Sequence, residues 1–135
     1  MAITGLEAEG TRGACGIVGA PSTTNQSCMA VIVTDALLTA YLFHYYVFCG
    51  KSLALQYCQG TKQQSYTAKL VRRLPISLPT EVTEQTAICA VLSDMDAELT
   101  ALEQRLTKTR ALKQAMMQEL LTGKTRLLPK DADHA

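Results

Sequence analysis

The sequence has few of the features that mark a secreted, membrane-spanning or metal-binding protein. Its cysteines form no CxxC pair and have no nearby set of histidines. Their odd number and apolar neighbours predict reduced, buried thiols in a cytoplasmic protein. The first residues contain neither a basic start nor an apolar run, so we expect no signal peptide. The cysteines are Cys15, Cys28, Cys49, Cys58 and Cys89.

The most apolar stretch, residues 36–50, is too short to cross a lipid bilayer. It includes His44 and several tyrosines, and its fifteen residues fall short of the roughly 20 that a transmembrane helix needs. We therefore predict no membrane span and a buried core helix at this position. On such a stretch His44 is expected to be a core histidine and not a metal ligand.

Patterns of catalytic or cofactor-binding residues are also missing. Gly13, Gly16 and Gly19 do not have the spacing of a dinucleotide-binding loop. Asp94 and Asp96 stand two apart on a predicted helix, so they point to different sides and cannot share one metal ion. Neither the base pocket of a methyltransferase nor the clustered acids and lysine of a nuclease are present. We therefore predict a non-catalytic protein with no cofactor and no metal.

The sequence Gly-Lys-Thr at residues 123–125 resembles the tail of a phosphate-binding loop, but its context differs. Such a loop follows the pattern GxxxxGK[ST] between a strand and the start of a helix. Here Gln118 occupies the position of the first glycine, and the segment follows a predicted helix. Gly123 fits a residue with positive φ just beyond a helix end, with Lys124 and Arg126 near the negative end of the dipole. We interpret the segment as a helix stop.

The first 79 residues predict a small sheet covered by one helix, which is an α+β arrangement. Residues 1–12 show little periodicity, and we expect them to fray. Asp35 is a candidate N-cap for the helix, and Gly50 is expected to bend or divide it. In chain order the pattern predicts one or two short strands within 11–26, a buried strand over 27–34, a helix over 35–57, a polar loop over 59–69 and a strand over 70–79.

Two polar segments are candidates for contact with nucleic acid. Residues 1–79 carry six basic and three acidic side chains, an excess that permits contact with a polyanion without requiring it. Glutamine can read adenine edges, and lysine can bind guanine or phosphate. The same residues could instead form only a solvated loop and a turn. The candidates are Asn25, Gln26, Thr61, Lys62, Gln63, Gln64 and Ser65.

The residues after Pro79 predict one long helix, from about Glu81 to Thr122, with Thr80 as N-cap. Apolar residues recur at steps of four and three, which is the seam of a coiled coil, and the seam shifts after Thr109. Acidic residues cluster early in this helix and basic residues late, which suits the helix dipole. We expect the seam to pack against a partner helix. Its residues are Ile88, Leu92, Met95, Leu99, Leu102, Leu106, Leu112, Met116 and Leu120.

Three stretches of the chain, 11–33, 59–79 and 84–128, resemble the C-terminal part of a type I restriction-modification specificity subunit. The most specific element of the resemblance is the sequence MMQELLTG at 116–123. The second most specific is the glycine pattern that precedes Thr-Asn-Gln near residue 25. The resemblance implies a partial target recognition domain followed by a long, coiled-coil-type helix. It further implies that the chain has one recognition domain where such subunits have two, and that this one lacks its front portion.

The resemblance also implies a function and a division of the chain. We expect residues 1–79 to form the DNA-binding part, 80–122 to form a helix for packing and subunit docking, and 123–135 to form a tail. The implied partners are double-stranded DNA, adenine-N6 methyltransferase subunits, the restriction subunit of the full complex, and another specificity chain or a second copy joined through the helix. The implied function is non-catalytic recognition of part of a split DNA site. The alternative is a helical assembly module that binds methyltransferase or specificity chains without binding DNA.

Overall fold

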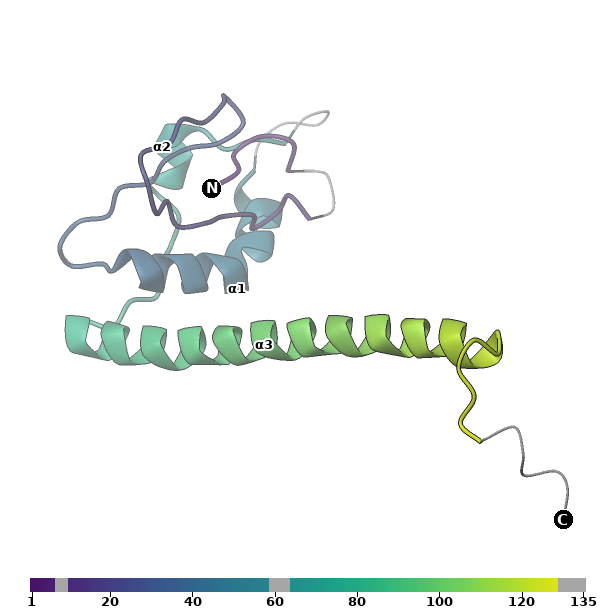
Figure 1. Ribbon diagram of the computed structural model, residues 1–135. Helices are drawn as coiled ribbons and strands as arrows, with labels where there is room; N and C mark the ends of the chain where they lie inside the picture. Colours follow the sequence, from purple (N-terminus) through teal and green to yellow (C-terminus); the bar gives the residue numbers. More distant parts are fainter. Residues whose placement is uncertain (7–9, 59–63, 129–135) are drawn as a thin grey trace, which may run out of the picture. The chain divides into compact units, whose positions relative to one another are not determined.

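The computed structural model describes residues 1–6, 10–58 and 64–128 (Figure 1). Within this part of the chain there are three helices: α1 (Thr39–Tyr57), α2 (Ala68–Val71) and α3 (Val82–Leu121). The chain divides into two compact units, Met1–Leu92 and Ser93–Ala135. The first unit contains the hydrophobic core, and the described part of the second unit consists of the remainder of α3 and the segment after it.

The predicted small sheet is wrong. Among the described residues, β pairing is limited to two isolated antiparallel bridges, Ala2–Cys28 and Thr4–Ser65. No strand forms over 11–26 or 70–79. Residues 27–34, predicted as a buried strand, form no strand either, and Ile32 in this segment is 93% exposed. β-branched residues favour a strand only where a neighbouring strand supplies hydrogen bonds and a face to cover. The short pairing with the N-terminal segment is all that the described residues supply.

The N-terminal segment, which we expected to fray, is part of the core. The Ile3 N–H donates to the carbonyl of Ser27 (2.9 Å), and the Ile3 carbonyl accepts from the N–H of Tyr66 (2.8 Å). Leu6 is fully buried. A short extended segment has too few inward side chains to show a period, so its burial left no pattern in the sequence. The core cluster consists of Leu6, Tyr46, Leu53, Ala54 and Tyr66.

Helix α1 confirms the predicted helix, but it is buried on only one face. Tyr46, Gly50, Leu53 and Ala54 are buried, and their spacing of four, seven and eight residues places them on one side of the helix. The other side is exposed, with Phe48 at 88%. The helix therefore packs on the core as predicted, but through one face only.

Gly50 neither bends nor divides α1, which continues without a break to Tyr57. It instead allows a loop to approach the helix closely. A Cβ atom at Gly50 would lie 2.7 Å from the Cα of Gly13 and 3.0 Å from the ring of Tyr46. Gly13 itself has a φ of +82°, which side chains rarely adopt. The two glycines therefore fix the position of the N-terminal loop on the helix.

The N-terminus of α1 is capped from α3 by Gln85, and not by Asp35. The residue before the helix, Leu38, makes no side-chain cap, and its N–H donates to Oε1 of Gln85 (3.0 Å). The Nε2 of Gln85 donates to the carbonyls of Ala36 (2.9 Å) and Pro79 (3.1 Å). Gln85 is fully buried. One side chain thus joins α1, α3 and the segment between them.

The segment predicted as a strand over 70–79 begins in α2, and its residues 74–79 continue without regular secondary structure. Thr67 caps α2, with its Oγ1 accepting from the N–H of Leu70 (3.3 Å). Two tyrosines of α1 bind residues 74–79 through hydrogen bonds. The Tyr41 hydroxyl donates to the carbonyl of Ser77 (2.9 Å), and the Tyr45 hydroxyl accepts from the Ser77 N–H (3.2 Å). The prolines in this segment cannot donate to a strand ladder, which favours side-chain anchoring.

Helix α3 confirms the predicted long helix, and Gly123 confirms the predicted stop. The helix begins at Val82, so Glu81, and not Thr80, directly precedes it. At its end Gly123 has a φ of +72°, and its N–H donates to the carbonyl of Leu120 (3.2 Å). The Nζ of Lys124 lies 3.6 Å from Oε1 of Glu119. The Gly-Lys-Thr sequence therefore ends a helix.

Candidate nucleic-acid interface and partner surface

The first pair of predicted DNA contacts, Asn25 and Gln26, lies in an exposed turn. The Asn25 Oδ1 accepts from the N–H of Ser27 (3.0 Å), and the Asn25 carbonyl accepts from the N–H of Cys28 (3.2 Å). This is the behaviour of a turn residue, the alternative that the sequence left open. Gln26 is exposed and accessible to a ligand.

Of the loop candidates, Thr61, Lys62 and Gln63 lie outside the described residues, whereas Gln64 and Ser65 are described and half-buried. The Oε1 of Gln64 accepts from Nη2 of Arg12 (3.4 Å), and Ser65 forms a bridge with Thr4. The fold therefore uses this end of the loop to hold the N-terminal segment.

The two groups of candidates flank the same N-terminal segment. The turn that follows Gln26 pairs with it through Ala2 and Cys28, and the loop pairs with it through Thr4 and Ser65. Residues about 40 positions apart in the sequence are thus held by one short segment. No pattern in the sequence indicated this arrangement, because residues 1–6 lack periodicity.

Burial changes the ionisation of several side chains in the described part of the first unit. Burial raises the pKa of Tyr66 well above its usual range, and it also raises the pKa of Tyr46. The two hydroxyls influence each other's ionisation, although among the described residues neither has a hydrogen-bond partner of ordinary geometry. Burial also raises the pKa of four thiols, which disfavours the thiolate needed for nucleophilic chemistry. These thiols are Cys15, Cys49, Cys58 and Cys89.

The cysteines agree with only part of the prediction. All five are free in the structure, but only Cys89 is buried as predicted: Cys28 is exposed, and Cys15, Cys49 and Cys58 are half-buried. His44 is half-buried, with its ring edge-to-face against Phe43 at 5.2 Å between centroids. No group of three or more potential metal ligands occurs among the residues that the structure describes. In the same residues, no helix combines the length and hydrophobicity required to span a membrane.

The apolar seam predicted on the long helix is exposed along most of α3. Met95, Leu99 and Leu102 leave 57%, 56% and 52% of their surfaces accessible. Leu92, Leu106, Leu112 and Met116 are exposed as well. Only the two ends of the seam, Ile88 and Leu120, are half-buried. A row of exposed large apolar side chains at this spacing is typical of a surface that binds another helix.

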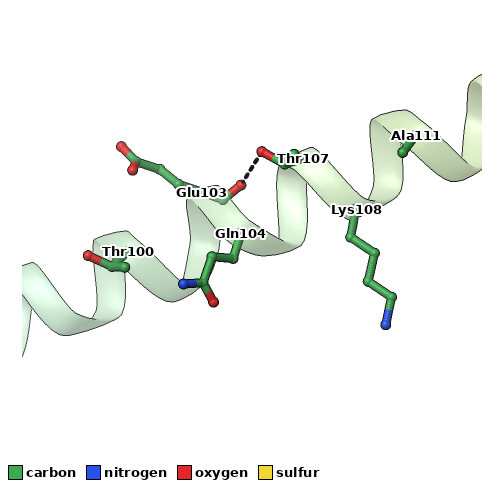
Figure 2. A pocket seen from close by; sticks show the side chains of 6 residues that line it. All are labelled: Thr100, Glu103, Gln104, Thr107, Lys108 and Ala111. Carbon is green, nitrogen blue, oxygen red and sulfur yellow. Dashed lines mark hydrogen bonds between the residues drawn. The ribbon is translucent and has the colours of Figure 1, made fainter.

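An open depression of about 480 Å³ lies on α3, and all of its lining comes from this one helix. Figure 2 shows its side chains on successive turns, with the Thr107 hydroxyl donating to the Glu103 carbonyl (2.9 Å). Small-molecule sites are concave and bury most of their ligand, whereas a single helix cannot enclose one. The lining residues are Thr100, Glu103, Gln104, Thr107, Lys108 and Ala111.

A comparison with known protein families identifies the family to which the chain belongs. The family described as type I restriction modification DNA specificity domain matches residues 3–112. The chain belongs to this family. The match covers most of the first unit and much of α3, and it begins before the resemblance seen in the sequence. Residues 116–123, the element of the resemblance that looked most specific, lie outside the matched span. No solved structure matches the chain.

Membership in the specificity-domain family gives the chain a DNA specificity role in type I restriction-modification. Such domains are in general non-catalytic. The apolar seam exposed along most of α3 agrees with a protein that works together with other subunits.

Proposed function

We propose that this specificity domain recognises part of a split DNA site and docks adenine-N6 methyltransferase subunits. In this proposal residues 1–79 contact DNA, 80–122 bind protein partners and 123–135 form a tail, within a cytoplasmic complex. The observation that carries the proposal is the exposed seam of α3 in a chain whose family match spans both parts. A specificity protein without catalytic groups can act only by positioning other subunits.

The seam favours a helical partner on energetic grounds. Fully burying one leucine or methionine side chain contributes about 1.5–3 kcal/mol. Residues such as Leu99 and Leu102 already bury about half of their surfaces, so a partner would add about 1 kcal/mol for each. The six exposed seam residues between Met95 and Met116 would then contribute about 6 kcal/mol before the cost of association. This gain is of the same order as the cost of association, about 4–15 kcal/mol, so specific pairing requires a partner that buries apolar side chains of its own.

The charge distribution favours an antiparallel partner helix. Asp94, Asp96 and Glu98 stand near the start of the second unit, whereas the basic residues of α3 in this unit lie between Arg105 and Lys113. An antiparallel arrangement would place the acids of one helix beside bases of the other if the partner has the same polarity. Exposed pairs of this kind contribute about 0–1 kcal/mol each. They would therefore select orientation more than affinity.

A reconstitution experiment tests the proposal. The purified chain, mixed with methyltransferase subunits, a second specificity chain and S-adenosylmethionine, is expected to restore adenine methylation at a split site. Omitting either partner should abolish it. The chain alone should neither methylate nor cleave DNA. Methyl transfer by the isolated chain above the rate of a heat-killed control would contradict the proposal.

The base-reading role of the polar loop is tested separately. Replacing Gln63 and Gln64 by alanine should change sequence preference by about 1–3 kcal/mol for each lost base contact. Lys62→Ala should instead weaken binding to all duplexes alike and reduce the salt slope by about one. If both variants bind specific and random duplexes as the parent does, the loop is not the reader.

The alternative is an assembly module that binds protein partners without DNA. It is favoured by the engagement of Asn25 and Gln64 in hydrogen bonds within the fold. Salt dependence separates the two functions. Phosphate contacts give a steep linear decrease of log affinity with log salt, whereas an assembly module would have no DNA affinity to titrate.

A further inference from the structure

We infer that Lys69, Arg72 and Arg73 form a phosphate-binding surface that contacts the DNA backbone beside the polar loop. This inference rests on the proposed DNA recognition and assigns it a contact surface that the sequence patterns did not suggest. All three side chains belong to α2 and the turn directly after it, and all three are exposed. None of the three belongs to the hydrophobic core, and Arg72, the C-cap residue of α2, caps the helix through its backbone N–H and not through its side chain.

The geometry of α2 places the three bases together. Residues three and four apart lie on the same face of a helical turn, about 5–6 Å apart at Cβ, and Arg72 and Arg73 follow Lys69 at these intervals. Backbone hydrogen bonds extend the turn through both arginines, from Arg72 N–H to the Ala68 carbonyl (3.2 Å) and from Arg73 N–H to the Leu70 carbonyl (2.9 Å). The bases therefore form one compact cationic cluster.

Packing of the neighbouring residues directs this cluster outward. Leu70, Val71 and Leu74 are partly buried and pack against the core. Because these alternate with the bases along the turn, the side facing solvent is left to the charged residues. The inward residues also anchor the turn, so that its charges are carried on an ordered element.

The charge of the cluster is not balanced by nearby acids in the sequence. No aspartate or glutamate occurs from Tyr66 to Thr80. Three exposed positive charges at neighbouring positions repel each other, and a polyanion relieves this repulsion. Arginine and lysine both bind phosphate, arginine through two parallel N–H groups.

The position of the cluster relates it to the proposed reading loop. Gln64 and Ser65, the described end of that loop, lie only a few residues before α2. They are fixed by the hydrogen bond from Leu6 N–H to the Gln64 carbonyl (3.1 Å) and by the bridge between Ser65 and Thr4. Backbone contacts set the register of a protein on a duplex, and base contacts read the sequence. A phosphate-binding turn next to a reading loop would combine both functions.

The test compares DNA binding by the full chain and by the triple variant Lys69→Gln, Arg72→Gln, Arg73→Gln. Fluorescence anisotropy is measured with a specific and a random duplex between 50 and 200 mM salt, for the chain alone and for the chain with methyltransferase subunits and a second specificity chain. Three lost phosphate contacts should reduce the slope of log affinity against log salt by about 2.7. The parent's affinity should therefore fall about 40-fold more than the variant's over this range. The effect should be equal for both duplexes.

A matched control carries the same loss of charge in the tail, residues 123–135, to which no binding role is assigned: Lys124→Gln, Arg126→Gln and Lys130→Gln. This control should keep the parent's salt slope, and thermal unfolding followed by circular dichroism checks that both variants fold. Arg72→Lys with Arg73→Lys should also keep most of the slope. If the parent has a steep slope that the triple variant retains, or if the control loses as much, the inference is wrong while the proposed function stands. If the parent binds neither duplex in either condition, both are wrong.

Discussion

Gln85 is the side chain whose replacement should disturb the first unit most clearly. It is fully buried at the start of α3 and makes three hydrogen bonds to backbone groups of other segments. Gln85→Ala removes all three and leaves the N–H of Leu38 and the carbonyls of Ala36 and Pro79 without this partner. Gln85→Met removes the same bonds but keeps most of the side-chain volume.

The expected loss follows from the bonds. Each hydrogen bond contributes about 1 kcal/mol net, and a buried group left without a partner costs about 1–3 kcal/mol. We therefore expect Gln85→Ala to lower the free energy of unfolding by about 3 kcal/mol or more. Domains of this size have a total stability of about 5–15 kcal/mol. At about 4–8 °C for each kcal/mol, the midpoint of thermal unfolding should fall by at least about 12 °C.

A comparison of Gln85→Ala with Gln85→Met separates the effect of the lost hydrogen bonds from the effect of the lost side-chain volume. Gln85→Met should be nearly as unstable as Gln85→Ala if hydrogen bonds dominate, and clearly more stable if packing dominates. Gln85→Glu places an acceptor against the carbonyls of Ala36 and Pro79, so it should be less stable than Gln85→Met at neutral pH. It should recover partly in acid, where the protonated carboxyl can donate one hydrogen bond.

Urea unfolding and hydrogen exchange provide the measurements. The Leu38 amide, which donates to Gln85 in the parent, should exchange much faster in Gln85→Ala. Gln104 is an exposed glutamine of the same helix, and Gln104→Ala should change stability by less than about 0.5 kcal/mol. If Gln85→Ala changes stability as little as this control and leaves the Leu38 amide protected, the proposed cap is wrong.

Three further predictions follow from the packing, the seam and the ionisation of the core. Gly50→Ala should destabilise the first unit by about 1–3 kcal/mol in urea unfolding, because its Cβ would meet the Gly13 backbone at 2.7 Å. Leu99→Asp should weaken association through α3, measured by sedimentation at tens of micromolar. Burial raises the pKa of Tyr66, so the folded state retains a proton that the unfolded state loses above about pH 10. Stability should therefore fall as the pH rises past 10, less steeply in Tyr66→Phe.

Each of these predictions has a control or a contrary outcome. A Cβ at Gly16 would meet nothing within 4 Å, so Gly16→Ala should be close to neutral. Ala101 is exposed on the side of α3 away from the seam, so Ala101→Asp should leave association unchanged. A parent that is a clean monomer would contradict self-association through the seam. Superimposable pH profiles for the parent and Tyr66→Phe would contradict the role assigned to that hydroxyl.

The sequence by itself determined the two long helices, α1 and α3, and the glycine that ends α3, whereas α2 was predicted as the end of a loop and the start of a strand. α3 was predictable because a long helix depends on contacts three and four residues apart, and the seam repeats at that spacing without a glycine or proline. Gly123 was predictable as a stop because positive φ is a local property of glycine. The membership of the specificity-domain family was likewise indicated by the sequence, although the matched residues, 3–112, differ from those that the resemblance covered.

Only the tertiary structure decided how the first unit is assembled. The predicted strands failed because a strand requires a neighbour, and residues 1–6 supply one for only a few residues on each side. The true cap of α1 comes from Gln85, which stands 47 residues from Leu38, and no local pattern announces a bond across that distance. The same holds for Gly50, whose role depends on Gly13. Interactions between residues far apart in the chain leave no period in the sequence, and these interactions form the core that carries the candidate DNA contacts.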